Sequence, residues 1–343
     1  MQKKIIALAV AGLVSGAAFA QSNVTVYGIA DVGWEYLSSG RGDAKSTNQI
    51  SDGIQDASRV GFKGTEDLGN GLSAFFQLEQ RFNLDQGVNT AGTQRNSNVG
   101  LSGKSWGTVK LGSFGHPLDD YNGYSEAGGM GFGNSVIDQI TISDVKNGIE
   151  YISPNFSGLE AKIGYSTSVA AQDAGVEYDE SNDNTKAYFG AVAYANGPIK
   201  AAVAFNRMKP ASALPGTNAA SEWLVNGSYD FGMVKLGAGY DRAKDADKDV
   251  RKAWRIAVGA PVTANDTVAL SYSRVKYDWV GTSDDGKASG WGVSYSHAMS
   301  KRTNIYATYG KLSENDALEA SANTEAFNDT YESAFKVGMR HFF

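Results

Sequence analysis

The chain has 343 residues, with 41 glycines, 17 tyrosines, 6 prolines and no cysteine, and its formal net charge is −6. The lack of cysteine excludes a disulfide framework and a thiolate metal site, and the acidic balance disfavours nucleic acid as a partner. After residue 20 no stretch approaches 18 consecutive apolar residues, which excludes a helical membrane protein.

The first 20 residues have the pattern of a secretory signal peptide. Lys3 and Lys4 precede a short apolar run over residues 5–14, and Ala18-Phe19-Ala20 is a small-x-small cleavage site. The run is too short for a membrane-spanning helix. We therefore expect a signal peptide over residues 1–20 and a single mature domain over residues 21–343. Of the 31 basic residues, loss of Lys3 and Lys4 leaves 29 against 37 acidic ones, a formal charge of −8.

The mature chain shows repeated period-two alternation from residue 24 onwards. In the first candidate strand, residues 24–36, small or apolar side chains fall on one side. Similar alternation recurs in other segments, among them 59–62, 72–79, 159–167, 234–241 and 291–295. This alternation indicates β-strands with unlike environments on their two faces. A soluble β-sandwich would alternate as well, so alternation alone does not decide the class.

The connections between these segments fall into two lengths in strict succession. Short turns are predicted at 66–71, 103–107, 154–158, 196–198 and 230–232. Longer polar loops are predicted between them, at 38–53, 170–184, 209–220, 241–249, 281–287 and 313–329. Short turns on one rim and long loops on the other are typical of an outer-membrane barrel. The hairpins predict an all-β fold, a transmembrane antiparallel β-barrel of about 16 strands around an aqueous channel.

The last segment, residues 331–343, alternates most clearly and ends on the aromatic Phe343. It exceeds the roughly 9–11 residues that a tilted strand needs to cross a bilayer. An unprotected apolar edge strand invites aggregation. We therefore expect this strand to pair with the first strand and close the barrel.

One connection breaks the rhythm. After the strand 108–114 the chain is not expected to pair again until about residue 142. The glycine-rich stretch 115–141 holds His116, Asp119, Asp120, Glu126 and Asp138. A connection of this length is usually functional or disordered, so an inward-folded segment and a mobile external loop both remain open.

Several stretches resemble the general porins of Gram-negative bacteria, in particular those of β-proteobacteria. Residues 58–64, Ser-Arg-Val-Gly-Phe-Lys-Gly, resemble the second strand of that family, and residues 64–69 are the most specific local match. Residues 95–101 resemble the fourth strand and residues 146–151 the start of the sixth, although Asn98 and Lys146 depart from the usual residues. The terminal Phe343 matches the residue that serves family members in outer-membrane assembly. The resemblance covers the whole mature chain.

The resemblance implies a pore constriction. The third long loop of these porins folds into the barrel, and basic residues lie on the wall opposite to it. Carried over, the wall residues are Arg59, Arg95 and Lys146, and the loop acids are Asp119, Asp120 and Glu126. Unlike charges across a narrow water-filled gap create a transverse field that favours polar solutes. The residues around Arg59 support its place on the pore wall independently of the resemblance, because Val60 and Phe62 on the lipid side direct the Arg59 side chain inwards.

The resemblance also implies a homotrimer. In the fourth strand the row opposite Arg95 is Asn96, Asn98 and Gly100, and small residues line the first strand. Polar and small outward rows would suit contact with protein better than contact with lipid. We expect the first strands and the loop over residues 83–93 to hold the trimer, with outer-membrane lipids and lipopolysaccharide around it.

The expected function is passive diffusion of ions and small hydrophilic solutes across the outer membrane of a Gram-negative bacterium, without a cofactor. The alternatives are an outer-membrane barrel enzyme and a surface adhesin. His116 near Asp119 could mimic a catalytic base, but a plain loop histidine is the simpler interpretation. Residues 245–249 begin like a calcium loop but lack its later glycine and glutamate. We interpret them as a solvated loop, with weak divalent-ion bridging to lipopolysaccharide left open.

Overall fold

The computed structural model describes residues 23–39, 45–127, 144–168, 185–209, 218–281, 285–315 and 331–343. The predicted signal peptide and residues 128–141 of the predicted constriction loop lie outside them. The described chain forms one antiparallel sheet. Its strands are β1 (Asn23–Ser39), β2 (Thr47–Asp52), β3 (Arg59–Gly69), β4 (Leu72–Asn83), β5 (Val88–Gly103), β6 (Gly107–Gly115), β7 (Asp144–Ile152), β8 (Leu159–Ser166), β9 (Lys186–Asn196), β10 (Ile199–Lys209), β11 (Ala220–Asp230), β12 (Lys235–Lys244), β13 (Val250–Pro261), β14 (Asp266–Asp278), β15 (Gly286–Ala298), β16 (Thr303–Glu314) and β17 (Tyr331–Phe342).

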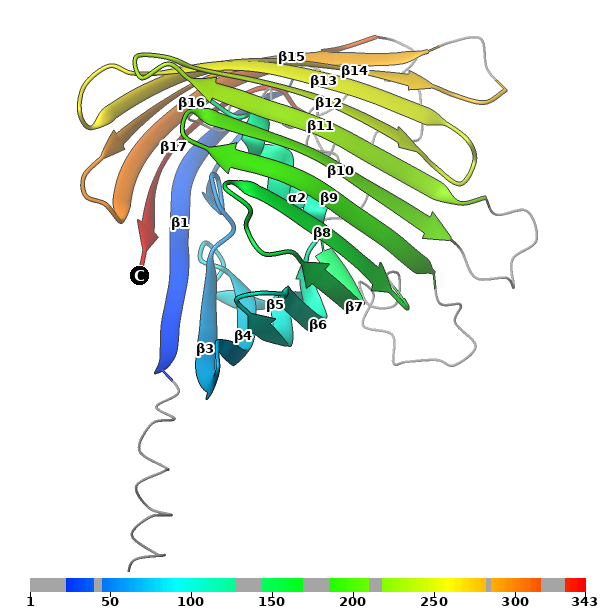
Figure 1. Cartoon of the computed structure of the whole chain (residues 1–343). Coiled ribbons are helices and arrows are strands. Elements are labelled where there is room, and N and C mark those ends of the chain that lie inside the picture. Colours follow the sequence, from blue (N-terminus) through cyan, green and yellow to red (C-terminus); the bar gives the residue numbers. More distant parts are fainter. Residues whose placement is uncertain are drawn as a thin grey trace, which may run out of the picture.

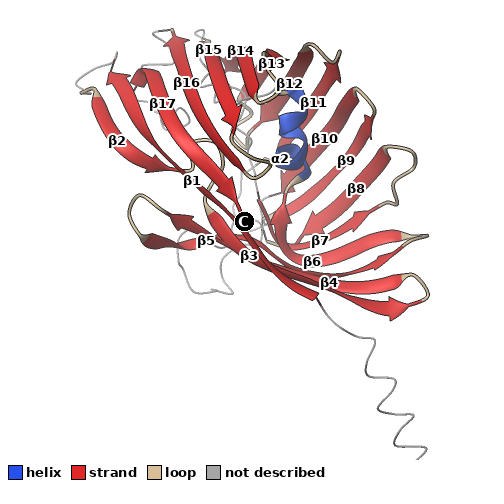
Figure 2. Cartoon of the chain, turned by 90° about the vertical axis from the view of Figure 1, so that its left-hand side faces the viewer, coloured by secondary structure: helices blue, strands red, loops and turns tan. Residues whose placement is uncertain are grey.

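The sheet closes on itself as a barrel, which confirms the predicted fold class. From β3 to β17 each strand pairs with its neighbour in the chain, and β17 pairs antiparallel with β1. In that seam Ile29 lies opposite Phe342 and Trp34 lies opposite Val337. Figure 2 shows β17 alongside β1, with the chain end at the seam. The predicted pairing of the last strand with the first is therefore confirmed.

The second strand position is interrupted. The first half of β1, up to Ile29, pairs with β3, and its second half, from Val32, pairs with β2. Strands β2 and β3 therefore occupy one position on the same side of β1, and the described barrel has 16 strand positions. The interruption at residues 53–58 is a bend. The loop predicted over residues 38–53 is wrong in part, because β2 lies within it.

The two faces of the wall differ as the alternation predicted. On β9, β10 and β11 the side chains of Val192, Val203 and Val225 are exposed, whereas their neighbours Ala191, Ala204 and Leu224 are buried. Val24, Val26, Phe335, Val337 and Met339 continue the exposed apolar face across the seam. Exposed apolar side chains recur on the other described strands around the barrel, and an apolar face of this extent marks contact with lipid or protein.

The connections alternate in length around the rims. Short turns join β3 to β4, β5 to β6, β9 to β10 and β11 to β12, as predicted. In the first of these turns Asn70 and Gly71 have φ values of 53° and 78°, the left-handed conformation that a tight hairpin turn requires. The loop predicted over residues 83–93 is shorter than expected, because β5 already begins at Val88.

The stretch after β6 contains helix α2 (Pro117–Asn122) and the 3₁₀ turn η2 (Gly123–Ser125). Leu118 and Tyr121 pack with Ala191, Ala204 and Leu224, which belong to the buried face of β9–β11. Helix α2 therefore contacts the wall on the face opposite to the exposed apolar one. Figure 1 shows it behind the strands of that wall, and Figure 2 shows it beside them. No helix in the described part of the chain is long and apolar enough to cross a membrane.

Candidate functional site

Two of the predicted basic wall residues share one carboxylate. Arg95 Nε lies 2.7 Å from Glu79 Oε1, and Arg59 Nε lies 3.7 Å from Glu79 Oε2. The hydroxyl of Tyr27 also donates to Glu79 Oε2, at 3.0 Å, and Gln77 donates to that hydroxyl at 2.6 Å. One carboxylate thus serves two guanidinium groups, which leaves a formal charge of +1 on these three side chains.

The positive groups of this cluster are also the accessible ones. The side chains of Arg59 and Arg95 are 19% and 31% exposed, whereas that of Glu79 is 4% exposed. Glu79 lies on the face opposite to its exposed neighbour Leu78. A solute on the inner side of the wall therefore meets guanidinium groups first, and the carboxylate acts mainly on the arginines.

A β-bulge brings Arg95 to this position. Leu78 pairs with Ser97 and Gln80 pairs with Gln94, so β5 has one more residue than β4 between the two pairs. Arg95 and Asn96 both lie opposite Glu79, and the strict alternation of β5 is broken there. Without the bulge Arg95 would share the outward face of Val99 and Leu101, which are exposed.

The same bulge corrects the predicted outward row. Asn98 is buried and Gly100 is buried, so these residues do not form an outward row opposite Arg95. The amide of Asn98 donates to the Ser113 carbonyl, and Asn96 Oδ1 accepts the Gly115 N–H. These side chains satisfy backbone groups around the start of the long connection, and they are not evidence for a subunit interface.

The loop acids have direct partners that the sequence did not single out. Asp120 Oδ2 lies 2.7 Å from Lys162 Nζ on β8, and Glu126 Oε1 lies 3.8 Å from Arg255 Nη1 on β13. Asp119 is exposed, and Lys146 is half-buried on β7. The closest ion-pair partner of Arg59 and Arg95 is Glu79 of the wall itself. Placement of Asp119, Asp120 and Glu126 opposite Arg59, Arg95 and Lys146 stays a prediction.

Arg255 anchors the start of the long connection. Its guanidinium, 1% exposed as a residue, donates to Ser125 Oγ and to the Asn122 carbonyl, the latter at 2.9 Å. Asn226 donates to the carbonyls of Tyr121 and Asn122, each at 3.0 Å. These bonds satisfy the C-terminal carbonyls of α2, which have no partner within the helix.

Glycines on the neighbouring strands make room for this contact. A Cβ at Gly237 would overlap the Ser125 backbone, and one at Gly259 would overlap the Ala127 carbonyl oxygen. Lys162, Arg255 and these glycines are the part of the site that sequence reasoning missed. Glycine recurs on β12 and β13 at positions where the inner face would otherwise carry side chains. This recurrence was the available signal in the sequence for the close approach of another backbone segment.

His116 caps helix α2. Its Nδ1 accepts the Leu118 N–H at 3.1 Å, and its ring centroid lies 5.0 Å from that of Phe189. The residue is fully buried, and this burial lowers the pKa of His116 to about 3. A buried histidine that is used as a helix cap is not available as a catalytic base, so the sequence alternative of a His116–Asp119 pair is not supported by the geometry.

The acidic stretch 245–249 forms a hydrogen-bonded turn. The N–H of Asp249 donates to Asp245 Oδ1 at 2.9 Å, and Asp249 Oδ1 accepts the Val280 N–H at 2.6 Å. Among the described residues no group of three or more histidine, aspartate or glutamate side chains is arranged to hold a metal ion.

Comparisons with known proteins agree on one family. A family profile described as Gram-negative porin matches residues 7–317. Over the full length of both chains, this chain is 35% identical to outer membrane porin protein 32 of Delftia acidovorans and 30% identical to an outer membrane porin protein of Bordetella pertussis.

Solved structures extend the comparison to the fold. An anion-selective porin from Comamonas acidovorans superposes with a TM-score of 0.72 at 27% identity, over 94% of this chain and 100% of that one. The trimer form of OmpT, an outer membrane protein of Vibrio cholerae, superposes with a TM-score of 0.69 over 94% of this chain and 99% of that one. At 17% identity the latter likeness concerns the fold alone.

Proposed function

This chain belongs to the Gram-negative porin family and is a porin of the outer membrane, and we propose on that basis that its barrel is a water-filled channel for passive diffusion of ions and small hydrophilic solutes. The observation that carries the proposal is the closed barrel with an exposed apolar outer face and charged side chains, such as Arg59 and Arg95, on its inner face. The solute gradient is the driving force, and no cofactor is needed.

Conductance tests this proposal. Purified protein in a planar lipid bilayer should produce stepwise current increments that are proportional to the applied voltage. Protein that is folded and inserted but gives no such steps would refute the channel. The same measurement separates the channel from a barrel enzyme and from a surface adhesin, neither of which is supported by the relatives.

We propose further that the connection after β6 folds into the barrel and narrows it, and that the narrow part favours anions. The contact of α2 with the buried face of β9–β11 supports the first statement. The accessible guanidinium groups of Arg59 and Arg95, with Glu79 hidden behind them, support the second, as does the likeness to an anion-selective porin. Fixed positive charge in a narrow pore raises the local anion concentration. A reversal potential of the cation-selective sign in a KCl gradient would refute this preference.

The proposed assembly is a homotrimer in a layer of outer-membrane lipid and lipopolysaccharide. A ring of three is a closed symmetry that a membrane barrel can adopt. The hairpin between β4 and β5 exposes Leu84, and an apolar side chain on a hairpin tip suits burial against a neighbouring barrel. A monomer measured by light scattering, in a detergent that preserves the conductance, would contradict the trimer.

A further inference from the structure

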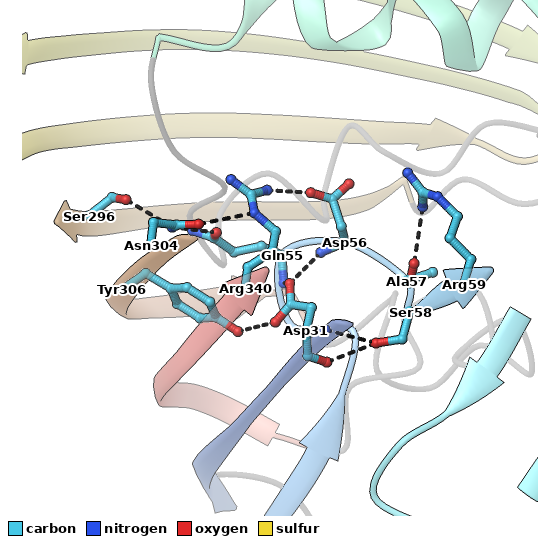
Figure 3. A network of polar contacts seen from close by, with 10 residues as sticks. All are labelled: Asp31, Gln55, Asp56, Ala57, Ser58, Arg59, Ser296, Asn304, Tyr306 and Arg340. Atoms are coloured by element: carbon cyan, nitrogen blue, oxygen red, sulfur yellow. Dashed lines mark hydrogen bonds and ion pairs between the residues drawn. The ribbon is translucent and has the colours of Figure 1, made fainter. Parts of the chain in front are cut away.

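The bend at residues 53–58 lies on the inner side of the wall, between β2 and β3. At this point β1 passes from one partner to the other, and Asp31 faces the bend. The Ser58 hydroxyl accepts the Asp31 N–H at 2.9 Å and donates to the Asp31 carbonyl at 3.1 Å. The bend therefore takes the hydrogen-bonding role that an uninterrupted strand would have beside β1 (Figure 3).

The carboxylate of Asp31 holds the backbone of the bend. Asp31 Oδ2 accepts the N–H groups of Gln55 and Asp56, at 2.9 and 2.7 Å. Its other oxygen, Oδ1, accepts a hydrogen bond from the hydroxyl of Tyr306 on β16. Asp31 has no exposed surface and Tyr306 is 2% exposed, so this three-way contact is shielded from water.

A second set of contacts ties the bend to the other side of the seam. Arg340 of β17 forms an ion pair with Asp56 and donates to Asn304 Oδ1 at 3.2 Å. The amide of Asn304 donates to Gln55 Oε1 at 3.2 Å and to Ser296 Oγ at 3.0 Å. The bend is thus held by strands β1, β16 and β17, which belong to opposite ends of the chain (Figure 3).

The bend leads directly into Arg59. Arg59 Nη1 donates to the Ala57 carbonyl at 3.0 Å, so its guanidinium is bonded to the bend at one end and lies beside Glu79 at the other. A free arginine side chain has several rotatable bonds and points along a wall in many directions. Here the position of the Ala57 carbonyl, and hence of the whole bend, limits where the guanidinium lies.

We infer that the bend positions the guanidinium of Arg59. Asp31, Tyr306 and Arg340 hold the bend in place and thereby set the ion preference of the pore. The inference rests on the proposed channel function. Tyr306 carries no charge, and Asp31 is buried, so neither acts on a passing ion as a fixed surface charge. Asp31 and Tyr306 affect permeation by fixing the position of the Arg59 guanidinium.

The test replaces Tyr306 without changing any charge. Tyr306→Phe removes the hydroxyl that Asp31 accepts, and Tyr309→Phe is the control, because Tyr309 lies on the same strand with its ring exposed. In a KCl gradient we expect the reversal potential of Tyr306→Phe to shift towards zero and its open-channel current to become noisier. Tyr309→Phe should behave like the wild type. Equal reversal potentials and noise for both variants would overturn the inference.

A second measurement shows whether the effect passes through Arg59. In an Arg59→Gln background, Tyr306→Phe should produce no further shift, because two changes that act through one group are not additive. The same shift in both backgrounds would overturn the inference. If Tyr306→Phe yields little folded barrel, Asn304→Ala takes its place in the same cycle, since it also leaves the charges of Arg59 and Asp31 unchanged.

Conductance measurements on the wild-type protein separate a failure of this inference from a failure of the proposed function. Wild-type protein that inserts without ohmic steps would refute the channel itself. Wild-type protein that conducts, together with a Tyr306→Phe variant of identical selectivity and noise, would refute the positioning role and leave the channel standing.

Discussion

Gly28 and Phe343 exchange two backbone hydrogen bonds, each with an N–O distance of 3.1 Å. A Cβ at Gly28 would overlap the ring of Phe343, so the glycine also provides the space in which the terminal ring lies. The last residue of the chain is therefore the final pair in the seam between β1 and β17. Without it, the N–H and carbonyl of the buried Gly28 would lose these partners, and an unpaired backbone group that is shielded from water is costly.

Deletion of Phe343 is expected to reduce folded protein in the outer membrane far more than deletion of Asp247, an exposed loop residue. The two lost hydrogen bonds contribute about 1 kcal/mol each, and the vacated space above Gly28 adds to the loss. Heat-modifiable migration in gel electrophoresis of outer-membrane fractions measures the folded share. Normal levels of folded barrel from the Phe343 deletion would contradict a role of this residue in closure.

The barrel itself could be predicted from the sequence because its signals are local. Period-two alternation, the succession of short turns and long loops, and the terminal aromatic strand each depend on neighbouring residues. The seam followed from them, because a membrane strand cannot leave its edge unpaired. Asn70 and Gly71 carry the turn chemistry in the sequence itself, and their φ values agree with it.

The parts that were not predicted depend on contacts between distant residues. The bend at 53–58 is held by Asp31 and Tyr306, which are 275 positions apart. The bulge at Arg95 shifts the inward and outward positions of β5 by one residue. Strict alternation without the bulge therefore placed Asn98 on the outward face. Lys162 and Arg255 become loop partners only when β8 and β13 are brought beside α2. In each case the sequence shows the side chains but not the register that brings them together.

Neutralising Arg59 and Arg95 together, as Arg59→Gln and Arg95→Gln, is expected to shift selectivity towards cations. The change removes both accessible guanidinium groups and leaves the carboxylate of Glu79. Charges within about 8 Å act on one another at physiological salt, so a change on the pore wall acts on ions in transit. Reversal potentials in a KCl gradient measure the shift.

The matched control is a pair of outer-loop acids, Asp245→Asn and Asp249→Asn. These residues lie in the turn between β12 and β13, outside the strands, and should have a much smaller effect. Neutralising Asp119 and Asp120 of α2, the predicted constriction acids, should shift selectivity in the opposite direction, towards anions. An outer-loop change that moved the reversal potential as far as the Arg59/Arg95 change would show that these arginines do not line the constriction.

Gly259→Ala is expected to displace the start of the long connection while the barrel stays folded. The new Cβ would overlap the Ala127 carbonyl oxygen, and overpacking of this kind costs about 1–3 kcal/mol. Gly227→Ala on the nearby strand β11 is the control, because its Cβ would come no closer than 3.1 Å to another heavy atom. Hydrogen exchange of residues 116–127, followed by mass spectrometry, should be faster in Gly259→Ala alone. Equal exchange in both variants would show that the glycine does not support the docking of η2.

Acidification is expected to loosen the contact of α2 with the wall, through His116. Its pKa in the docked state is lowered to about 3 by burial, whereas an exposed histidine has a pKa of about 6.5. Above about pH 6.5 the imidazole is neutral in both states, and the docked state keeps its full stability. Below that pH the undocked state binds a proton that the docked state does not, and docking loses about 1.4 kcal/mol per pH unit until the pH approaches the docked pKa. The positive charge of Lys162 also lowers the pKa of His116, whereas a contact with the Asn206 side chain raises it, and burial has the largest effect.

The decisive window lies between about pH 6.5 and pH 5, above the range in which ordinary carboxylates titrate. In this window hydrogen exchange of residues 116–127, corrected for its intrinsic pH dependence, should accelerate as the pH falls. His116→Asn is the matched variant, because asparagine keeps an acceptor for the Leu118 N–H at the helix N-cap but does not titrate. In this variant the corrected exchange should be independent of pH over the window. A pH dependence that persists unchanged in His116→Asn would show that another group controls the docking of α2.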